Sequence, residues 1–169
     1  MANTLKTLDS VGGFSINKDL LVDESKNLKN INSLEVKSSF FADSATSHYI
    51  MRGVNASVLS VDDVSSTIEI GSNTINFIEA HIIGVNDNGA ASISKKIESA
   101  VYVDNAGQVT EMSSMETTIK DSIPDGQTWT VSPFTSGSAN RFSYQTTRIG
   151  TTLTIKWVAY VKVVSIAWQ

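Results

Sequence analysis

Two histidines are the residues of this chain best suited to acid–base or metal chemistry. His48 lies in a polar stretch, residues 45–48, where we expect it to be exposed, whereas His81 lies in the apolar run 80–83. A histidine titrates near neutral pH and often serves as a general base or metal ligand. Within an apolar run, however, a packed and hydrogen-bonded histidine is the more common case. The histidines are not spaced as a ligand pair, so the sequence predicts no zinc site.

The carboxylates form no recognisable catalytic pattern. Glu69, Glu79 and Glu98 fall within predicted strands, and a glycosidase needs two carboxylates at a fixed separation across a cleft. Asp62 and Asp63 lack the alternating acidic residues of a calcium loop, which favours an exposed turn. No Gly-x-Ser-x-Gly motif is present to supply a hydrolase nucleophile. The sequence therefore predicts a protein that is not an enzyme and that uses no metal or cofactor.

Four aromatic residues flank a Ser/Gly-rich loop at residues 135–140 and raise the alternative of sugar binding. Exposed rings beside amides and hydroxyls stack on sugars in lectin-like sites. Under this alternative, the glycan-stacking residues are Trp129, Phe134 and Tyr144. Strand alternation equally places these rings, with Phe142, in the core of a β-sandwich, and we favour that interpretation.

Composition excludes several classes of protein. The chain has 169 residues, 13 Lys and Arg against 17 Asp and Glu, a net charge of −4 and no cysteine. An acidic chain without a basic cluster is a poor binder of nucleic acid, and a chain without cysteine has neither disulfides nor thiolate sites. No apolar run approaches ~20 residues, and residues 1–9 lack the apolar region of a signal peptide. We expect synthesis in a cytoplasm and function without membrane insertion.

The second half of the chain has the pattern of an antiparallel β-sandwich. Residues 73–169 contain about six strand-like segments, and turn sequences occur at residues 86–89, 104–107 and 124–126. Abundant β-branched and short polar residues favour strands over helices. Regular short strands separated by turns predict an all-β, jelly-roll-like sandwich domain over residues 73–169.

The first half is predicted to contain two extended segments. Residues 1–13 have no periodic pattern and end in Val-Gly-Gly, which predicts a flexible arm. Residues 14–72 are predicted to form an extended segment of short strands. Those at residues 14–36 are too short to offset the entropy of ordering them, and those at residues 39–71 join the segment to the main domain. We therefore expect copies from several chains to wrap around one axis, with a loosely ordered region as the alternative. The expected subunit contacts here are Leu20, Val22, Leu28, Ile31, Leu34 and Val36.

The last strand, within residues 151–168, is apolar on both faces toward its end. One face carries Leu153, Ile155, Trp157, Ala159, Val161 and Val163. The opposite face begins polar and then becomes apolar, and a strand apolar on both faces needs cover on both. We expect Tyr160, Val164, Ile166 and Trp168 to contact a neighbouring subunit. A penultimate tryptophan would otherwise fray into water.

Through the short strands of residues 20–36 and the segments 77–81 and 150–159, the chain resembles the fibre and appendage proteins of tailed bacteriophages. The likeness lies in short strands separated by Asn, Ser and Asp turns at residues 20–36. It lies also in residues 77–81 and 150–159, which open and close a domain similar to small sandwich domains of phage virion proteins.

The resemblance implies a homotrimeric, extended virion component: a short tail, neck or head fibre subunit. Its N-terminal part would attach to the capsid, neck or tail, and its sandwich would project outward and take part in host attachment, with a host surface glycan as a further partner. A capsid decoration protein and a lectin-like module are the alternatives. A depolymerase is disfavoured because no paired acid and base emerge. The resemblance implies no catalytic residues.

Overall fold

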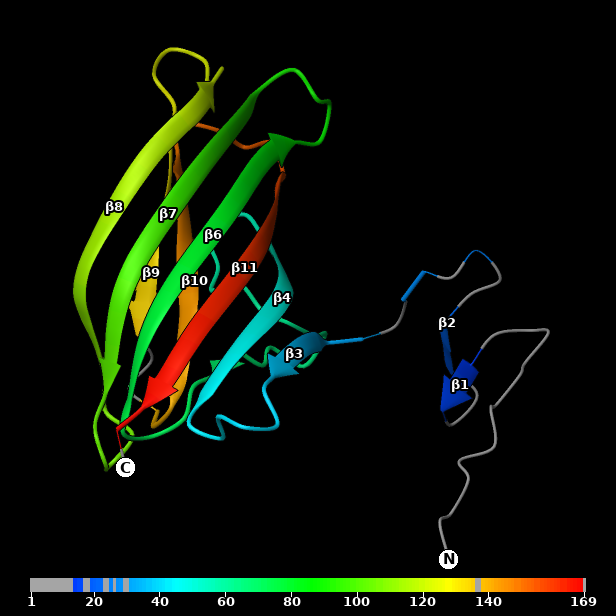
Figure 1. Cartoon of the computed structure of the whole chain (residues 1–169). Helices are drawn as coiled ribbons and strands as arrows, with labels where there is room; N and C mark the ends of the chain where they lie inside the picture. The colour runs from blue at the N-terminus through cyan, green and yellow to red at the C-terminus, as the bar shows by residue number, and fades with distance from the viewer. Residues whose placement is uncertain are drawn as a thin grey trace, which may run out of the picture. The chain divides into compact units, whose positions relative to one another are not determined.

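The computed structural model describes residues 14–16, 19–22, 25, 27–28, 31–135 and 138–168 of the chain (Figure 1). The chain forms two compact units, residues 1–32 and residues 33–169. Within the described residues, all regular structure is β-strand, in eleven strands. The predicted all-β class is confirmed.

The first unit contains one small hairpin. Strands β1 (Phe14–Ile16) and β2 (Asp19–Val22) pair in antiparallel fashion, and an isolated bridge joins Val22 to Leu28. These strands are as short as the sequence predicts, and a two-stranded hairpin is at best marginally stable in water. The expected wrapping of several chains stays a prediction, and the predicted arm at residues 1–13 lies outside the described residues.

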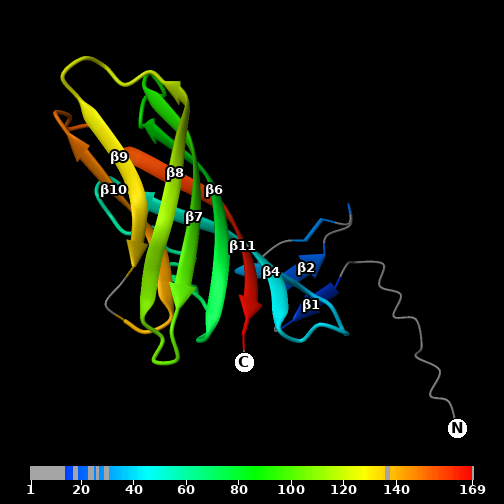
Figure 2. The same cartoon turned by 60° about the vertical axis from the view of Figure 1, so that its left-hand side comes forward.

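The second unit is built on a six-stranded antiparallel sheet (Figures 1 and 2). Across the sheet the order is β3-β4-β11-β6-β7-β8. The strands are β3 (Ser33–Lys37), β4 (Ser44–Val54), β6 (Thr74–Asn86), β7 (Ser92–Val103), β8 (Val109–Asp121) and β11 (Ile155–Ala167). Strand β11, the last in the chain, therefore lies between β4 and β6 in the middle of the sheet.

A three-stranded sheet packs on one face of the large sheet and closes the core. Its order is β5 (Ile68–Glu69), β10 (Arg141–Ile149) and β9 (Thr128–Thr135). The rings of Trp129 on β9 and Trp157 on β11 meet edge to face, with centroids 6.5 Å apart. The predicted antiparallel β-sandwich is confirmed, with sheets of six and three strands, and its jelly-roll-like character stays a prediction.

The compact unit begins about forty residues earlier than the predicted boundary at residues 72 and 73. Strand β4 pairs with β11 along its whole length, and β5 pairs with β10. Residues 33–72 therefore contribute strands to both sheets, although the sequence assigned them to an extended segment. Residues 44–49 of β4 are partly buried on both faces and are mostly small or polar, so the strand has little of the apolar alternation that predicts a strand.

Asn55, the residue after β4, is hydrogen-bonded to the start of β11. Its backbone N–H donates to the Ile155 carbonyl over 2.7 Å, and its side-chain oxygen accepts the Ile155 N–H over 3.0 Å. Its carbonyl accepts the indole N–H of Trp157 over 2.9 Å, so the buried ring leaves no unpaired donor. Asn55 has φ of 60°, a left-handed conformation that asparagine tolerates better than most residues.

Substituting Gly84 is expected to destabilise the sandwich. A Cβ atom at Gly84 would lie 2.5 Å from Cζ3 of the Trp157 ring, so Gly84→Ala forces the ring or the strand to move. We expect a loss of about 1–3 kcal/mol in the free energy of unfolding, measured by urea denaturation. Gly71→Ala is the matched control, because its Cβ would make only an ordinary 3.5 Å contact with Thr74. Equal stabilities of the two variants would contradict this account of the packing.

Candidate functional site: the outer face of the six-stranded sheet

The face of the six-stranded sheet that points away from the three-stranded sheet is called here the outer face. Strand alternation sends Ile155, Trp157, Ala159, Val161 and Val163 of β11 into the core. The even-numbered residues of β11 lie on the outer face, and among them Tyr160, Val164 and Ile166 are exposed. The two-faced character predicted for the last strand is confirmed from Ile155 onward, whereas Leu153, predicted on the core face, precedes β11 and is exposed.

One end of the outer face carries an apolar patch. Strand register sets Val164 opposite Phe77, and Ile166 opposite Ile75, which in turn faces Tyr102. Phe77 is 47% exposed and Ile166 is 55% exposed. The apolar patch consists of Val36, Ile75, Phe77, Tyr102, Val164, Ile166 and Trp168. These side chains come from β3, β6, β7 and β11 and the residue after it, so the patch crosses much of the sheet.

Trp168 is partly held by its own chain. Its ring stacks on that of Tyr102, with centroids 5.2 Å apart and planes 7° from parallel. Its backbone N–H donates to the Asn73 carbonyl over 3.2 Å. The ring nevertheless remains 44% exposed. The contact expected between Trp168 and a neighbouring subunit stays a prediction.

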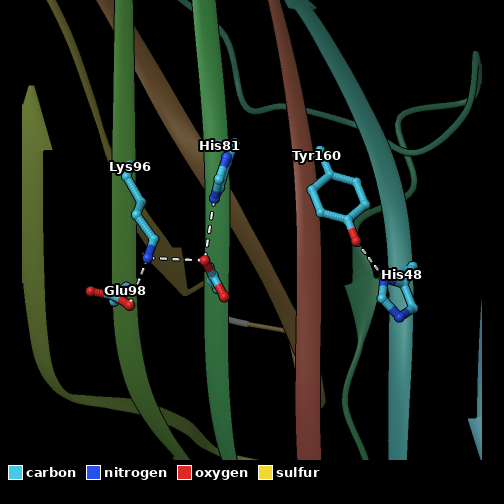
Figure 3. Close-up of polar contacts among 6 residues, drawn as sticks. His48, His81, Lys96, Glu98 and Tyr160 are labelled. Carbon is cyan, nitrogen blue, oxygen red and sulfur yellow. Dashed lines mark hydrogen bonds and ion pairs between the residues drawn. The ribbon is translucent and has the colours of Figure 1, made fainter. Parts of the chain in front are cut away.

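Next to the apolar patch, the outer face carries charged residues on β6 and β7 (Figure 3). The Lys96 ammonium lies 3.0 Å from a Glu79 carboxylate oxygen and 3.1 Å from a Glu98 oxygen. His81 Nε2 lies 3.2 Å from the same Glu79 oxygen. Hydrogen bonds from Lys96, and secondarily from His81, hold the pKa of Glu79 below its ordinary value. Bonds to Glu79 and then to Glu98 raise the pKa of Lys96.

Strands β4 and β11 bring a second polar pair to the same level of the sheet. The Tyr160 hydroxyl and Nδ1 of His48 form a hydrogen bond of 2.6 Å (Figure 3). Lys162 lies opposite His48 on β4 and opposite Glu79 on β6. The polar belt is defined here as His48, Glu79, His81, Lys96, Glu98, Tyr160 and Lys162.

The two histidines differ from expectation in exposure. His81 was expected to be packed in the core, but its side chain is 60% exposed. Residues of β6 alternate between the two faces of the sheet. His81 therefore points outward, while its neighbours Ala80 and Ile82 fill the core. It is hydrogen-bonded, as predicted, but to an exposed partner. His48 was expected to be exposed and is half-buried beside Tyr160.

The proposed glycan-stacking platform needs correction. Trp129 is 2% exposed and Tyr144 is fully buried, because both point between the two sheets. Phe134 is half-buried. Burial raises the pKa of the Tyr144 hydroxyl, as expected for a phenol in an apolar core. Two of the three rings are therefore not available to a sugar, and the core interpretation holds for them.

The other carboxylates singled out in the sequence take part in a turn or in ion pairs. Asp62 accepts backbone N–H groups from Val64 over 3.1 Å and Ser66 over 2.8 Å, as in the predicted turn. Hydrogen bonds from Ser66, with a smaller one from Val64, lower the pKa of Asp62. Glu69 lies in β5 within 3.4 Å of Arg141. Glu79 has a lowered pKa, whereas a general acid needs a raised one.

The residues that the structure describes hold neither a metal cluster nor a membrane-spanning helix. In that part of the chain, no three His, Cys, Asp or Glu side chains are grouped so that they could hold a metal ion. In the same residues, no helix is long and apolar enough to cross a membrane.

A cavity of about 310 Å³ lies among β3, β4, β5 and β11. Its lining includes Glu35, Lys37, Tyr49, Glu69 and Ser165. This volume is near the lower end of small-molecule sites, and its mixture of charges and hydroxyls specifies no ligand class. The sequence did not predict the cavity, because its walls come from strands far apart along the chain.

Sequence reasoning missed Ile75, Phe77 and Tyr102, which complete the apolar patch. A signal for the first two was present: β6 carries apolar residues on both faces, as β11 does. The two-face argument applied to residues 75–85 would have found them. Tyr102 had no such signal, because it joins the patch only through the pairing of β7 with β6.

No protein-family model and no curated protein matches the chain. Among solved structures, the chain is similar to a tailspike protein, gp49, from the Acinetobacter baumannii bacteriophage Fri1, described as a capsular polysaccharide depolymerase. The sequences are 14% identical, and the TM-score is 0.47. The match covers 83% of this chain and 21% of the tailspike chain, so it spans about a fifth of that protein.

Removing the Lys96 ammonium is expected to raise the pKa of Glu79. In Lys96→Met, the main cause of the lowered pKa is lost, so the carboxyl should titrate nearer its ordinary value. Carboxyl ¹³C NMR over a pH series measures this directly. Because the folded-state pKa is lowered, the ion pair contributes stability above the ordinary glutamate pKa and loses it as the pH falls through the folded value. Lys95→Met is the control, since Lys95 bonds to Glu116 instead. An unchanged Glu79 pKa in Lys96→Met would contradict the assignment.

Proposed function

We propose that this chain is a structural subunit of a bacteriophage virion, a fibre or appendage component that associates with copies of itself and catalyses no reaction. The observation that carries the proposal is the apolar patch on the outer face. Monomeric proteins rarely expose large contiguous apolar surface, and patches rimmed by polar residues commonly mark protein–protein contacts. The patch lies directly beside the polar belt.

The short hairpin and the exposed apolar residues of the first unit also support the proposed self-association. The β1–β2 hairpin is too small to be stable alone. Nearby, Leu28 and Ile31 are exposed apolar residues, and Val22 is half-buried. Pairing with the same segment of other copies would cover such residues. Leu34 and Val36 on β3 are exposed as well.

The sequence resemblance supplies the biological setting of the proposal. The N-terminal part attaches to the capsid, neck or tail of the virion, and the sandwich takes part in host attachment. A capsid decoration protein would use the same self-associating face. Release of reducing sugar from a host capsule preparation by the purified chain would overturn the non-enzymatic part of the proposal.

The proposed self-association predicts that the protein in solution has a larger mass than one chain. Size-exclusion chromatography with light scattering should give about three times the chain mass of 18.2 kDa, because covering both apolar regions requires further copies and the resemblance implies a homotrimer. A folded monomer at micromolar concentration would contradict the proposal.

Placing a charge in the apolar patch is expected to prevent association. In Phe77→Asp, a carboxylate would be buried against apolar surface of the next copy, so we expect association to weaken at least about tenfold. Sedimentation velocity over a concentration series measures the loss. Ile149→Asp is the matched control, since Ile149 is similarly exposed but lies on the three-stranded sheet. If both variants assemble like the native chain, the patch is not the contact surface.

A further inference from the structure

The turn between β6 and β7 contains a pair of residues that can react with each other, Asn88 and Gly89. Asn88 is the one asparagine of the chain that a glycine follows. Because glycine has no side chain, its backbone nitrogen is unshielded and can attack the side-chain amide carbon of the asparagine before it. The product is a cyclic succinimide, which water opens to aspartate or to isoaspartate. This chemistry changes the side chain without any enzyme or cofactor.

The turn leaves both residues open to water. Residues 87–90 are exposed, whereas Asn86 at the end of β6 is 6% exposed. Gly89 has φ of 72°, and a Cβ atom placed on it would meet no other atom within 4 Å. A succinimide needs space beside the backbone, and its hydrolysis needs water. The surroundings of Asn88 supply both.

A backbone hydrogen bond activates the side-chain amide of Asn88. Its Oδ1 accepts the Ala90 N–H over 2.9 Å. When the Gly89 nitrogen attacks the amide carbon, negative charge develops on this same oxygen. A backbone N–H that is already directed at such an oxygen stabilises the developing charge, as the donors of an oxyanion hole do. Ala90 is therefore a positioning residue for the reaction.

One contact within the turn opposes the reaction. The Gly89 N–H donates to the Asn86 carbonyl over 3.1 Å, and this bond must open before the nitrogen loses its proton. The bond lies at an exposed hairpin tip, where local opening costs much less free energy than unfolding of the core. The contact therefore slows the reaction without preventing it.

We propose that Asn88 deamidates spontaneously in the folded protein. The Gly89 nitrogen gives its proton to water or hydroxide and forms a bond to Cγ of Asn88. The bond from Cγ to Nδ2 breaks, and ammonia leaves. Water then opens the ring: addition at Cγ gives aspartate, and addition at the backbone carbonyl carbon gives isoaspartate. The sum of the steps consumes one water and releases one ammonia.

The two products have different effects on the sheet. Aspartate keeps an oxygen that accepts the Ala90 N–H, so the turn keeps its shape and gains a negative charge next to Asp87. Isoaspartate adds a methylene to the backbone and displaces Gly89 from the Asn86 carbonyl. The turn lies at the end of the sheet where β11 begins, and the Asp87 N–H donates to the Thr154 carbonyl there over 2.9 Å (Figure 1). Isoaspartate thus weakens the support of the start of β11.

Peptide mapping by mass spectrometry tests the proposal on the full chain. The protein is incubated at mildly alkaline pH, and each asparagine is followed over time for replacement of its amide by a carboxyl group. We expect aspartate and isoaspartate at Asn88 while circular dichroism shows that the chain stays folded. Asn105, which is exposed in another turn but precedes an alanine, is the internal control and should stay intact.

Two results of this incubation would overturn the proposal. In the first, Asn88 stays intact in the folded chain while a synthetic peptide of residues 85–91 deamidates. In the second, Asn105 reacts as fast as Asn88. Neither result depends on the proposed function, because the measurement concerns one residue in any state of assembly.

A variant of Ala90 tests the activating hydrogen bond. Ala90→Pro removes the N–H that Asn88 Oδ1 accepts and leaves the Asn-Gly pair in place, so deamidation should slow about tenfold. Ala90→Ser keeps the N–H and should react at the native rate. An unchanged rate in a folded Ala90→Pro chain overturns the role of Ala90. Gly89→Ala shields the attacking nitrogen without removing this N–H, and reaction of that variant at the native rate would overturn the succinimide route.

Discussion

Burial of one face of β11 is the constraint on which the rest of the structure depends. The strand is hydrogen-bonded along both edges, to β4 and to β6, and it places Trp157 at the centre of the core. The glycine at position 84 leaves room for that ring, and Asn55 accepts its N–H. A large buried aromatic with its polar atom paired contributes strongly to a core and leaves few alternative packings.

Strand alternation then dictates the character of the outer face. Once the odd-numbered residues of β11 fill the core, its even-numbered residues point to the other side. The three-stranded sheet covers the inner face alone, so the apolar residues on the outer face have no cover within this unit. Their exposure follows from topology, because a single small second sheet packs on one side of a large one.

The outer face also combines two kinds of surface that serve different purposes in association. Apolar area supplies most of the free energy of burying a contact, whereas charges mainly determine which orientation is accepted. The patch and the polar belt lie side by side on the same strands. Apolar and charged residues therefore share one surface, and their positions both come from the register of β11, β6 and β7.

Local patterns in the sequence determined the all-β class, the turns and the two-faced nature of the last strand, because alternation and turn chemistry involve residues close together in the chain. Tyr160, Val164 and Ile166 could thus be assigned to an outer surface in advance. Tertiary structure alone decided which strands are neighbours. It placed His81 outside and Trp129 and Tyr144 inside, brought residues 33–72 into the sheets, and added Phe77 and Tyr102 to the patch. Sheet order and register join segments distant in sequence, and no local periodicity encodes them.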